Sequence, residues 1–251
     1  MATIELVQIS DCHLLAGPGA RLKGVDTEAA LAAVVADVAA GPAPAAVLVT
    51  GDLTQDGEAA SYHRFAARAA ALPAPVYALP GNHDDPAMLA AVLPDHGLAV
   101  VPRLRLDGWD VLMLDSTVPG SDDGALGEAR LGALEARLAE ARGRHVLVAL
   151  HHQPVVVGGA WDAVVSLADA EALFAVLDRH DNVRAVVWGH IHQPYEGRRG
   201  TVRLMGAPAT CFQFARDPAG GLGVGPEPSG YRRLGLGADG SVIGTVVWVP
   251  R

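Results

Sequence analysis

The sequence has few cysteines, few aromatic residues and an excess of acidic over basic residues. Its two cysteines, Cys12 and Cys211, lie far apart, which excludes a disulfide framework and favours a reducing compartment. Aromatic residues make up 5%, whereas half of all residues are hydrophobic, and Ala and Gly are heavily used, as in helices packed closely on sheets. The 28 acidic and 19 basic residues give a net charge of −9. This charge argues against binding to a nucleic-acid backbone, but it does not exclude a small anion held by metal cations.

A long uninterrupted hydrophobic run is also missing. The most apolar tract, 29–50, contains Asp37, Gly41, Pro42 and Pro44, and therefore cannot form a membrane-spanning helix. Residues 1–3 lead directly into a strand pattern, without the basic and long apolar regions of a signal peptide. We therefore expect a cytoplasmic protein with no membrane partner.

Continuous apolar runs alternate with helical patterns through the first 200 residues. Such runs are typical of strands that are covered on both faces, and the alternation predicts an α/β layered fold. Glycine at 51, 81 and 189 is expected to let the chain turn sharply after three of the runs. The expected strands are 4–9, 46–50, 76–79, 111–114, 146–150 and 185–188, and the expected helices are 27–40 (capped by Asp26 or Thr27), 58–72, 128–142 and 168–179.

The pattern changes near residue 202. Short apolar runs alternate there with turn residues, which predicts mostly antiparallel strands at 202–205, 211–215, 231–236 and 242–249. Residues 216–229, which contain Gly and Pro, are expected to form a long loop. We expect one domain over 1–251, with 202–251 as its β-rich part and the candidate dimer contact.

Five short segments with metal-ligating side chains follow predicted strands. In open α/β sheets, ligands collect beyond the carboxyl ends of the strands, so these segments are expected to meet at one edge. Each motif is weak alone, but their recurrence in this order is specific. The segments are Asp11-Cys12-His13, Gly51-Asp52, Gly81-Asn82-His83-Asp84, His151-His152 and Gly189-His190-Ile191-His192.

This set of side chains indicates the kind of metal. Imidazole and carboxylate groups without a thiolate suit Fe, Mn, Zn or Co rather than Ca or an iron–sulfur cluster. An extended backbone would point Asp11 and His13 the same way, and likewise His190 and His192, while Cys12 would turn away into the core. The residues thus predict a metal site without fixing the metal.

The ordered motifs D-x-H, G-D, G-N-H-D, H and G-H-x-H resemble those of calcineurin-like metallophosphoesterases. Further stretches are similar to bacterial class III cyclic nucleotide phosphodiesterases, so that the resemblance covers residues 4 to about 248. These stretches are 23–27, 79–84, His151-His152-Gln153-Pro154 with Trp161, 189–193 and 208–214.

The resemblance implies an αββα sandwich of two mixed sheets and a centre of two divalent or mixed-valence metal ions, Fe, Mn or Zn. It implies that Asp52 bridges the two ions and that His83 faces the substrate rather than a metal. The first ion would be held by Asp11, His13, Asp52 and His192, and the second by Asp52, Asn82, His151 and His190.

A centre of this kind suits hydrolysis of a phosphodiester. Two ions share a water, lower its pKa and clamp the phosphate for in-line attack. Asp52 would hold their separation, and Asn82 would keep the site less negative toward an anionic diester. His83 would either protonate the leaving oxygen or stabilise transition-state charge through a hydrogen bond.

Other residues near the motifs have ordinary interpretations. Asp84 is expected either to orient a histidine or to cap a helix near Pro86. His152 is a candidate for a substrate contact but is expected to point away from its neighbour. Asp115 is a candidate support of the site and is not counted as a ligand. Tyr62, Trp161 and Phe212 are candidates for stacking on a nucleobase but are more typical of a core. Arg198 and Arg199 are expected in a solvated turn, and His63, His96, His145 and His180 outside the site.

We therefore expect a phosphodiesterase that converts 3′,5′-cyclic AMP to 5′-AMP. The alternatives are an enzyme for another small diester, such as a 2′,3′-cyclic nucleotide or a glycerophosphodiester, and a non-catalytic scaffold with this fold. A nuclease fits the acidic charge less well. The expected partner is thus a small phosphodiester, and neither nucleic acid nor membrane.

Overall fold

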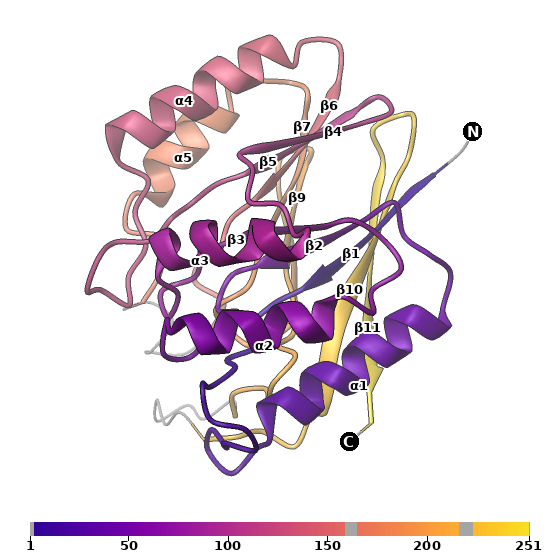
Figure 1. Cartoon of the computed structure of the whole chain (residues 1–251). Coiled ribbons are helices and arrows are strands. Elements are labelled where there is room, and N and C mark those ends of the chain that lie inside the picture. The colour runs from indigo at the N-terminus through magenta and orange to yellow at the C-terminus, as the bar shows by residue number, and fades with distance from the viewer. Residues whose placement is uncertain (1–2, 159–164, 216–222, 251) are drawn as a thin grey trace.

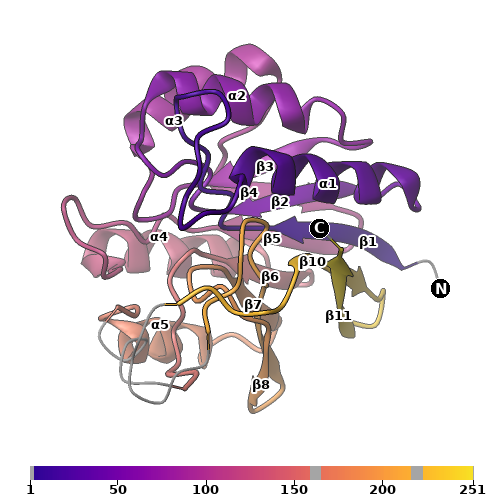
Figure 2. The ribbon, with the colours of Figure 1, turned by 90° about the horizontal axis from the view of Figure 1, so that it is seen from below.

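The computed structural model describes residues 3–158, 165–215 and 223–250. Two β-sheets pack face to face and are covered on their outer faces by helices, as the two views show (Figure 1, Figure 2). The first sheet has the order β11-β10-β1-β2-β3 and the second has the order β4-β5-β6-β7-β9-β8. The strands are β1 (Ile4–Ile9), β2 (Ala46–Thr50), β3 (Val76–Leu79), β4 (Arg103–Leu106), β5 (Trp109–Met113), β6 (His145–Ala149), β7 (Val183–Trp188), β8 (Tyr195–Arg199), β9 (Val202–Gly206), β10 (Ser229–Leu236) and β11 (Val242–Val249).

Helices α1, α2 and α3 lie over the first sheet, and α4 and α5 lie over the second (Figure 2). Asp26 caps α1 by accepting a hydrogen bond from the backbone N–H of Ala29 at 2.9 Å. Buried apolar residues form one cluster between the first sheet and its helices, one between the sheets, and one between the second sheet and its helices. The helices are α1 (Thr27–Ala40), α2 (Ala59–Ala69), α3 (Pro86–Val92), the short 3₁₀ helix η1 (Leu93–His96), α4 (Gly127–Glu140) and α5 (Ala170–Leu177).

Both sheets are mixed. In the first, β1, β2 and β3 are parallel, and β10 runs antiparallel to β1. In the second, β5, β6, β7 and β9 are parallel, whereas the edge strands β4 and β8 are antiparallel to their neighbours. This confirms the expected α/β sandwich of two mixed sheets. It also places the carboxyl ends of β1, β2, β3, β6 and β7 at the same side of the molecule.

Two local predictions are wrong, and one strand was missed. Residues 211–215 form no strand; instead Phe214 makes an isolated bridge to Val224. Arg198 and Arg199 belong to the edge strand β8 rather than to a turn, and Arg199 pairs with Asp178 at 2.7 Å. The strand β4 was not expected. The C-terminal part is mostly antiparallel, as predicted, although β9 lies parallel to β7.

A buried arginine joins the two sheets. Arg232 on β10 is fully buried, and its guanidinium pairs with Glu196 on β8. It also donates to the carbonyl oxygens of Gly206, at 2.8 Å, and Tyr195, at 3.2 Å. Three acceptors on the second sheet therefore compensate for the removal of this charge from water.

Candidate metal centre

The seven predicted metal ligands lie together where five strands end. They follow β1, β2 and β3 of one sheet and β6 and β7 of the other. The ligand atoms form overlapping clusters, each within 4.8 Å, among them His13 with Asp52 and His83, and Asp11 with Asp52 and His151. The five loops thus converge as the sequence predicted.

The backbone at these loops is left-handed rather than extended. Positive φ angles between 47° and 69° occur at Asp11, His13, Asp52, His190 and His192. The shared direction expected for Asp11 and His13 depended on an extended backbone, and these positive φ angles show that the backbone is not extended there. Non-glycine residues adopt this region at a cost, and such strain gathers at functional sites.

Close approach rather than a positive φ explains the glycine at position 81. A Cβ there would collide with the Oδ1 atom and the backbone nitrogen of Asp52. Gly51, in contrast, has a φ of +93°, and a Cβ there would also meet the ring of His151. The two glycines therefore let the loops after β2, β3 and β6 touch.

The donors predicted for the first ion lie at coordination spacing. The Nε2 atoms of His13 and His192 are 3.0 Å apart, His13 Nε2 is 3.4 Å from Asp52 Oδ2, and His192 Nε2 is 3.5 Å from Asp11 Oδ1. Two bonds of about 2.1 Å to one ion place their donor atoms roughly 3.0–3.4 Å apart. The spacing therefore fits a metal ion.

The second group of donors has the same spacing. His151 Nε2 lies 3.1 Å from Asn82 Oδ1, 3.2 Å from His190 Nδ1 and 3.4 Å from Asp52 Oδ2. Asp52 Oδ2 is thus equally far from His13 and His151, one in each group. A carboxylate in this place suits the bridging role predicted for Asp52.

Hydrogen bonds fix which nitrogen of each imidazole faces the centre. The Nδ1 atoms of His151 and His192 face the carbonyl oxygens of Thr50 and Phe212, each at 2.8 Å. The Nε2 atom of His190 faces the carbonyl oxygen of Val165 at 2.8 Å. A carbonyl can only accept, so that nitrogen carries a proton and the other nitrogen is the one that faces the centre and can bind a metal.

Burial keeps most of these imidazoles neutral. It lowers the pKa of His13 to about 4 and that of His190 to about 3, and it holds the pKa of His192 well below its ordinary value. Neutral imidazole is the form that binds a metal. The centre therefore needs little deprotonation at these positions.

The acidic groups and His151 are coupled. Burial raises the pKa of Asp11 to about 7. For Asp52, burial acts in the same direction, but His151 and His13 outweigh it and hold the pKa well below its ordinary value. For His151, burial lowers the pKa, but the nearby carboxylates of Asp52 and Asp11 raise it to about 9. Without a cation, the proton on His151 thus compensates for the Asp52 charge.

Asp84 has neither of its two predicted roles, which were to orient a histidine or to cap the helix near Pro86. Its carboxylate accepts hydrogen bonds from the backbone N–H groups of Leu53, Thr54 and Gly81, at 3.1, 3.1 and 2.9 Å. It does not orient a histidine, and the helix cap of α3 is Asp85. Asp84 therefore joins the loop of Asp52 to the loop of Asn82.

His152 does not point away from its neighbour. Its ring centroid lies 5.0 Å from that of His151 and 4.7 Å from that of His190, and its Nδ1 lies 2.8 Å from Ser116 Oγ. Burial lowers its pKa to about 2. Ser116 therefore holds a neutral ring against the donor cluster.

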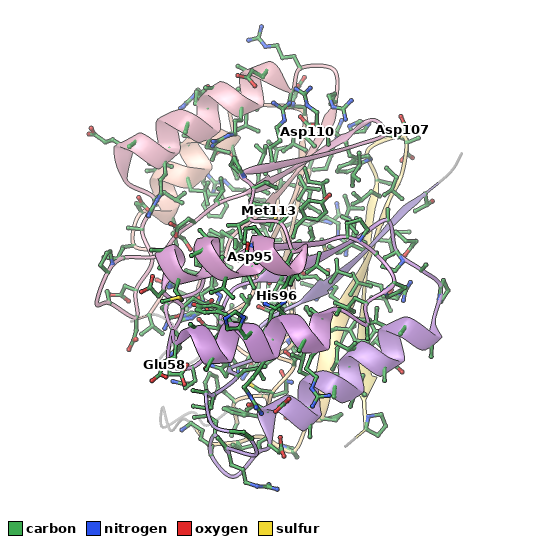
Figure 3. The ribbon with its side chains drawn as sticks, viewed as in Figure 1. Glu58, Asp95, His96, Asp107, Asp110 and Met113 are labelled. Carbon is green, nitrogen blue, oxygen red and sulfur yellow. The ribbon has the colours of Figure 1, made fainter. Side chains whose placement is uncertain are left out.

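The remaining histidines and Asp115 lie outside the donor clusters. His63 and His96 face each other at 2.8 Å on the exposed helical layer, where Figure 3 labels His96. Asp115 binds Thr117 and Arg130, at 2.7 and 3.0 Å. His145 contacts Ala238, and His180 pairs with Glu135.

A hollow of about 210 Å³ opens over the donors. His83 lines it and is partly exposed. Its backbone N–H donates to Asp52 Oδ1 at 3.0 Å. Beyond the donors, the hollow is lined by Leu22, Lys23, Gln55, Asp122, Val165, Phe212 and Phe214.

The aromatic residues that were candidates for stacking on a nucleobase lie in different environments. Phe212 lines the hollow, whereas Tyr62 is fully buried and donates its hydroxyl to Asp84 at 3.1 Å. Tyr62 is therefore a core residue, which is the more typical place for an aromatic side chain. Trp161 lies outside the described residues.

The segment 208–214 forms hydrogen bonds with the loop that carries Asp11. Both the backbone N–H and the hydroxyl of Thr210 donate to the carbonyl of Ser10, at 2.9 and 2.7 Å, and the same hydroxyl oxygen lies 3.1 Å from Cys12 Sγ. Cys211 N–H donates to the carbonyl of Asp11 at 3.3 Å. The two cysteines are buried, in keeping with packing roles, and Cys211 Sγ approaches His192 Nδ1 at 3.8 Å.

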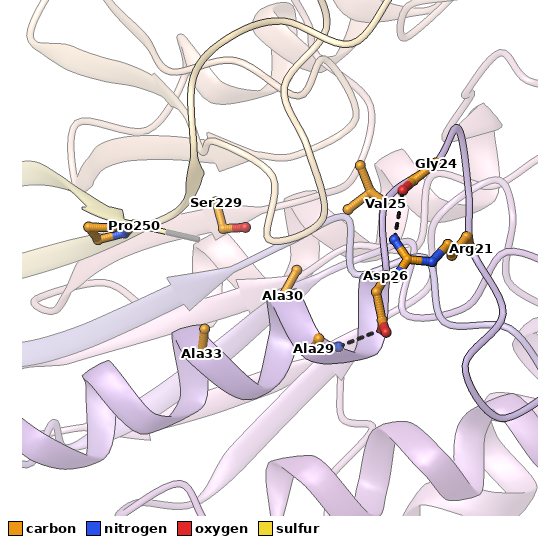
Figure 4. A pocket seen from close by; sticks show the side chains of 9 residues that line it. All are labelled: Arg21, Gly24, Val25, Asp26, Ala29, Ala30, Ala33, Ser229 and Pro250. Atoms are coloured by element: carbon orange, nitrogen blue, oxygen red, sulfur yellow. Dashed lines mark hydrogen bonds between the residues drawn. The ribbon is translucent and has the colours of Figure 1, made fainter.

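A second hollow, of about 340 Å³, lies beside the start of α1 (Figure 4). Arg21 reaches the carbonyl of Gly24 at 3.0 Å, and Ala29, Ala30 and Ala33 give it an aliphatic wall. None of the predicted site residues lines it. Within the stretch 23–27, Lys23 therefore lines the hollow over the metal donors, whereas residues 24–26 line the second hollow.

Sequence reasoning missed several residues of the centre. Gln55 contacts both His13 and His83, and its only signal was its place three residues after Asp52. Asp122 approaches Asn82 at 3.5 Å from a distant loop, and no motif marks it. Backbone acceptors such as Val165 carry no sequence signal at all.

The geometry agrees with comparisons to known proteins. Residues 4–194 match the family model of the calcineurin-like phosphoesterases. This match spans well over half of the sequence, and the chain belongs to the calcineurin-like phosphoesterase family. Family membership and the clustered histidines and aspartates together indicate a hydrolase with a metal centre.

Curated relatives cover almost the whole chain. The chain is 38% identical over 240 residues to the 3′,5′-cyclic adenosine monophosphate phosphodiesterase CpdA of Pseudomonas aeruginosa, covering 95% of this chain and 88% of the relative. The enzyme of the same name from Escherichia coli is 38% identical over 244 residues, with 96% and 88% covered. A 3′,5′-cyclic-nucleotide phosphodiesterase from Nostoc is 34% identical over 251 residues, with 98% and 93% covered. The resemblance to bacterial cyclic nucleotide phosphodiesterases is confirmed.

Solved structures share the fold at low identity. A dimetal phosphatase from Danio rerio has a TM-score of 0.65 and 14% identity, over 98% of this chain and 99% of that chain. A purple acid phosphatase from yellow lupin has a TM-score of 0.65 and 12% identity, over 99% of this chain and 52% of that chain.

Among the residues that the structure describes, no helix is long and apolar enough to cross a membrane.

Proposed function

We propose that this chain hydrolyses 3′,5′-cyclic AMP to 5′-AMP at a centre of two metal ions. The observation that carries the proposal is the position of Asp52, whose Oδ2 atom lies 3.4 Å from His13 and 3.4 Å from His151. One carboxylate is thus shared by two donor groups, next to a hollow lined by His83. The cyclic AMP phosphodiesterases, 38% identical over nearly the full chain, support the choice of substrate.

The predicted ligands divide into two sets around this carboxylate. Asp11, His13 and His192 complete one set, and Asn82, His151 and His190 complete the other. When bound, the two ions supply an activated water and neutralise charge on the phosphate. The donors are nitrogen and oxygen atoms without a thiolate, so we propose Fe, Mn or Zn as the occupants.

The reaction adds one water to the cyclic diester. The water oxygen bonds to phosphorus, the P–O3′ bond breaks, and O3′ ends as a hydroxyl. His83 lies beside the shared carboxylate and faces the hollow, where its ring can donate to an oxygen of the substrate. A hydrogen bond to charge that develops in the transition state is worth several kcal/mol in a site that excludes water.

The buried, unpaired cysteines support a reducing compartment for this activity. We therefore propose a cytoplasmic enzyme that acts on a small diffusible diester. The single-domain organisation over 1–251 and the candidate dimer contact in the β-rich part stay predictions.

A substrate panel tests the proposal. The purified chain is freed of metal, reconstituted with Mn, Fe or Zn singly, and incubated with 3′,5′-cyclic AMP, 2′,3′-cyclic AMP and a glycerophosphodiester. We expect the first to be the best substrate by kcat/KM, with 5′-AMP as the product by chromatography. Preference for either of the other diesters would move the assignment to that substrate, and no hydrolysis with any metal would overturn it.

A further inference from the structure

One amide side chain lies between a predicted metal ligand and the residue that faces the substrate. Gln55 Oε1 is 2.9 Å from His13 Nδ1, and Gln55 Nε2 is 2.9 Å from His83 Nδ1. The two rings stand edge to face, with centroids 5.0 Å apart. The backbone N–H of Gln55 is itself held by the carbonyl of Leu14 at 2.8 Å.

The partners decide which way this amide points. His192 donates from Nδ1 to the carbonyl of Phe212, so its Nε2 presents a lone pair toward His13. His13 Nε2 also faces Asp52 Oδ2, in the group of donors where a ligand needs a lone pair. With a cation bound among these three acceptors, His13 presents its lone pair from Nε2, and its proton is on Nδ1, which requires an acceptor. Of the two ends of the amide, only Oε1 can accept.

The orientation of the Gln55 amide, which His13 determines, also fixes the tautomer of His83. With Oε1 toward His13, the NH₂ group of Gln55 faces His83 and donates to its Nδ1. That nitrogen then carries no proton, so neutral His83 bears its proton on Nε2. A ring in this form presents an N–H donor to the hollow.

We propose that Gln55 is a positioning residue that sets opposite tautomers on two histidines, Nδ1–H on His13 and Nε2–H on His83. His13 thereby offers a lone pair to the centre, and His83 offers a hydrogen-bond donor to the phosphate or leaving oxygen. This inference rests on the proposed function for the role of His83, but the tautomers themselves do not depend on a substrate. It also selects between the two roles predicted for His83, in favour of a neutral hydrogen-bond donor.

Two substitutions at position 55 separate the two effects. Gln55→Glu keeps the shape but only accepts, so it preserves the acceptor for His13 and removes the donor to His83. Gln55→Leu removes both. We expect Gln55→Glu to retain bound metal, whereas Gln55→Leu loses metal affinity about 10–100-fold, the usual effect of removing an orienting partner.

Nitrogen NMR of histidine-labelled protein loaded with diamagnetic Zn reads the tautomers directly, with the His83 signal assigned by its loss in His83→Ala. We expect an unprotonated Nδ1 and a protonated Nε2 in the original chain, and a protonated Nδ1 in Gln55→Glu. A protonated Nδ1 on His83 in the original chain would overturn the proposal, whatever the enzyme acts on.

Kinetics on bis(p-nitrophenyl) phosphate, a generic diester, test whether Gln55 acts through His83. We expect Gln55→Glu to lower kcat about 10–100-fold with little change in KM, and to cause no further loss in the His83→Ala background. An equal loss in both backgrounds contradicts a role through His83. If no diester is hydrolysed, the proposed function fails, while the NMR result still decides the tautomers.

Discussion

Tyr62 donates its hydroxyl proton to Oδ1 of Asp84 at 3.1 Å, directly beneath the loops that carry Asp52 and Asn82. The same hydroxyl accepts from the backbone N–H of Asp85 at 2.8 Å. An aromatic residue from α2 is thereby joined to a carboxylate that already accepts from three backbone N–H groups. The helical layer and the metal loops form one connected hydrogen-bond network.

Asp84→Ala should weaken both stability and metal binding. It leaves several buried donors without an acceptor, which costs about 1–3 kcal/mol in the free energy of unfolding. Loss of an orienting partner should lower metal affinity about 10–100-fold. Urea unfolding and metal titration measure the two effects. Asp85→Ala is the matched control: it removes only the cap of α3, costs about 1 kcal/mol, and leaves metal affinity unchanged.

Asp52→Ala should remove both metal ions and the activity. Asp52 is the donor shared by both groups, so its loss exceeds the roughly 100-fold effect of losing an orienting partner. Elemental analysis of the purified variant gives the metal content. Asp115→Ala, which removes a carboxylate that binds Arg130 instead, should keep both ions. Near-normal turnover by Asp52→Ala would refute the bridging role.

His83→Ala should keep the metal but turn over slowly. His83 lines the hollow, and its predicted part is charge stabilisation, whose removal lowers kcat about 10²–10⁴-fold. His63→Ala, at an exposed position of α2, should have normal activity. Loss of metal from His83→Ala would mean that His83 is a ligand after all.

Metal affinity should rise with pH. In the metal-free chain the pKa of Asp11 is raised to about 7 and that of His151 to about 9, and both must release protons to become ligands. The proton competes below each pKa, so affinity increases as pH rises through this range. Calorimetry in buffers of different ionisation enthalpy counts the protons released. Binding that is independent of pH between about 6 and 9 would contradict this coupling.

Arg232→Met should destabilise the fold without changing the centre. It leaves the buried carbonyl of Gly206 without its donor, which costs about 1–3 kcal/mol in the free energy of unfolding. Arg233→Met, which loses an exposed hydrogen bond to Pro42 and a contact with Tyr231, should cost less than about 1 kcal/mol. Thermal unfolding compares the two variants, and equal stability would show that the buried arginine is not a link between the sheets.

The central strands could be predicted because burial on both faces leaves a continuous apolar run. Ile4–Ile9, Ala46–Thr50 and Val76–Leu79 coincide with the predicted strands residue for residue. The edge strands β4 and β8 contain charged residues because one side of each strand faces water. Their sequences therefore lack a continuous apolar run and resemble those of loops. The apolar run 211–215 reads as a strand but packs against the loops of the centre.

The predicted donors could be found because each follows a strand that was itself predictable. Their supports could not, because Gln55, Asp84 and the carbonyl of Val165 act through loop geometry. The left-handed turn at Asp11 is equally invisible in a sequence, since any residue type can be forced there by its surroundings.

The pairing of β1 with β10 sets the order in which the molecule can mature during synthesis. β1, which leads into Asp11, gains one of its two neighbours only when residues 229–236 have been made. His192 receives its orienting carbonyl from Phe212, 20 residues further along. A metal ion that meets the nascent chain encounters an incomplete set of ligands with unfixed tautomers. The environment of the ligands is therefore complete only when residues 229–236 have been made, and we expect mutations in the C-terminal hairpin to lower metal occupancy without touching a ligand.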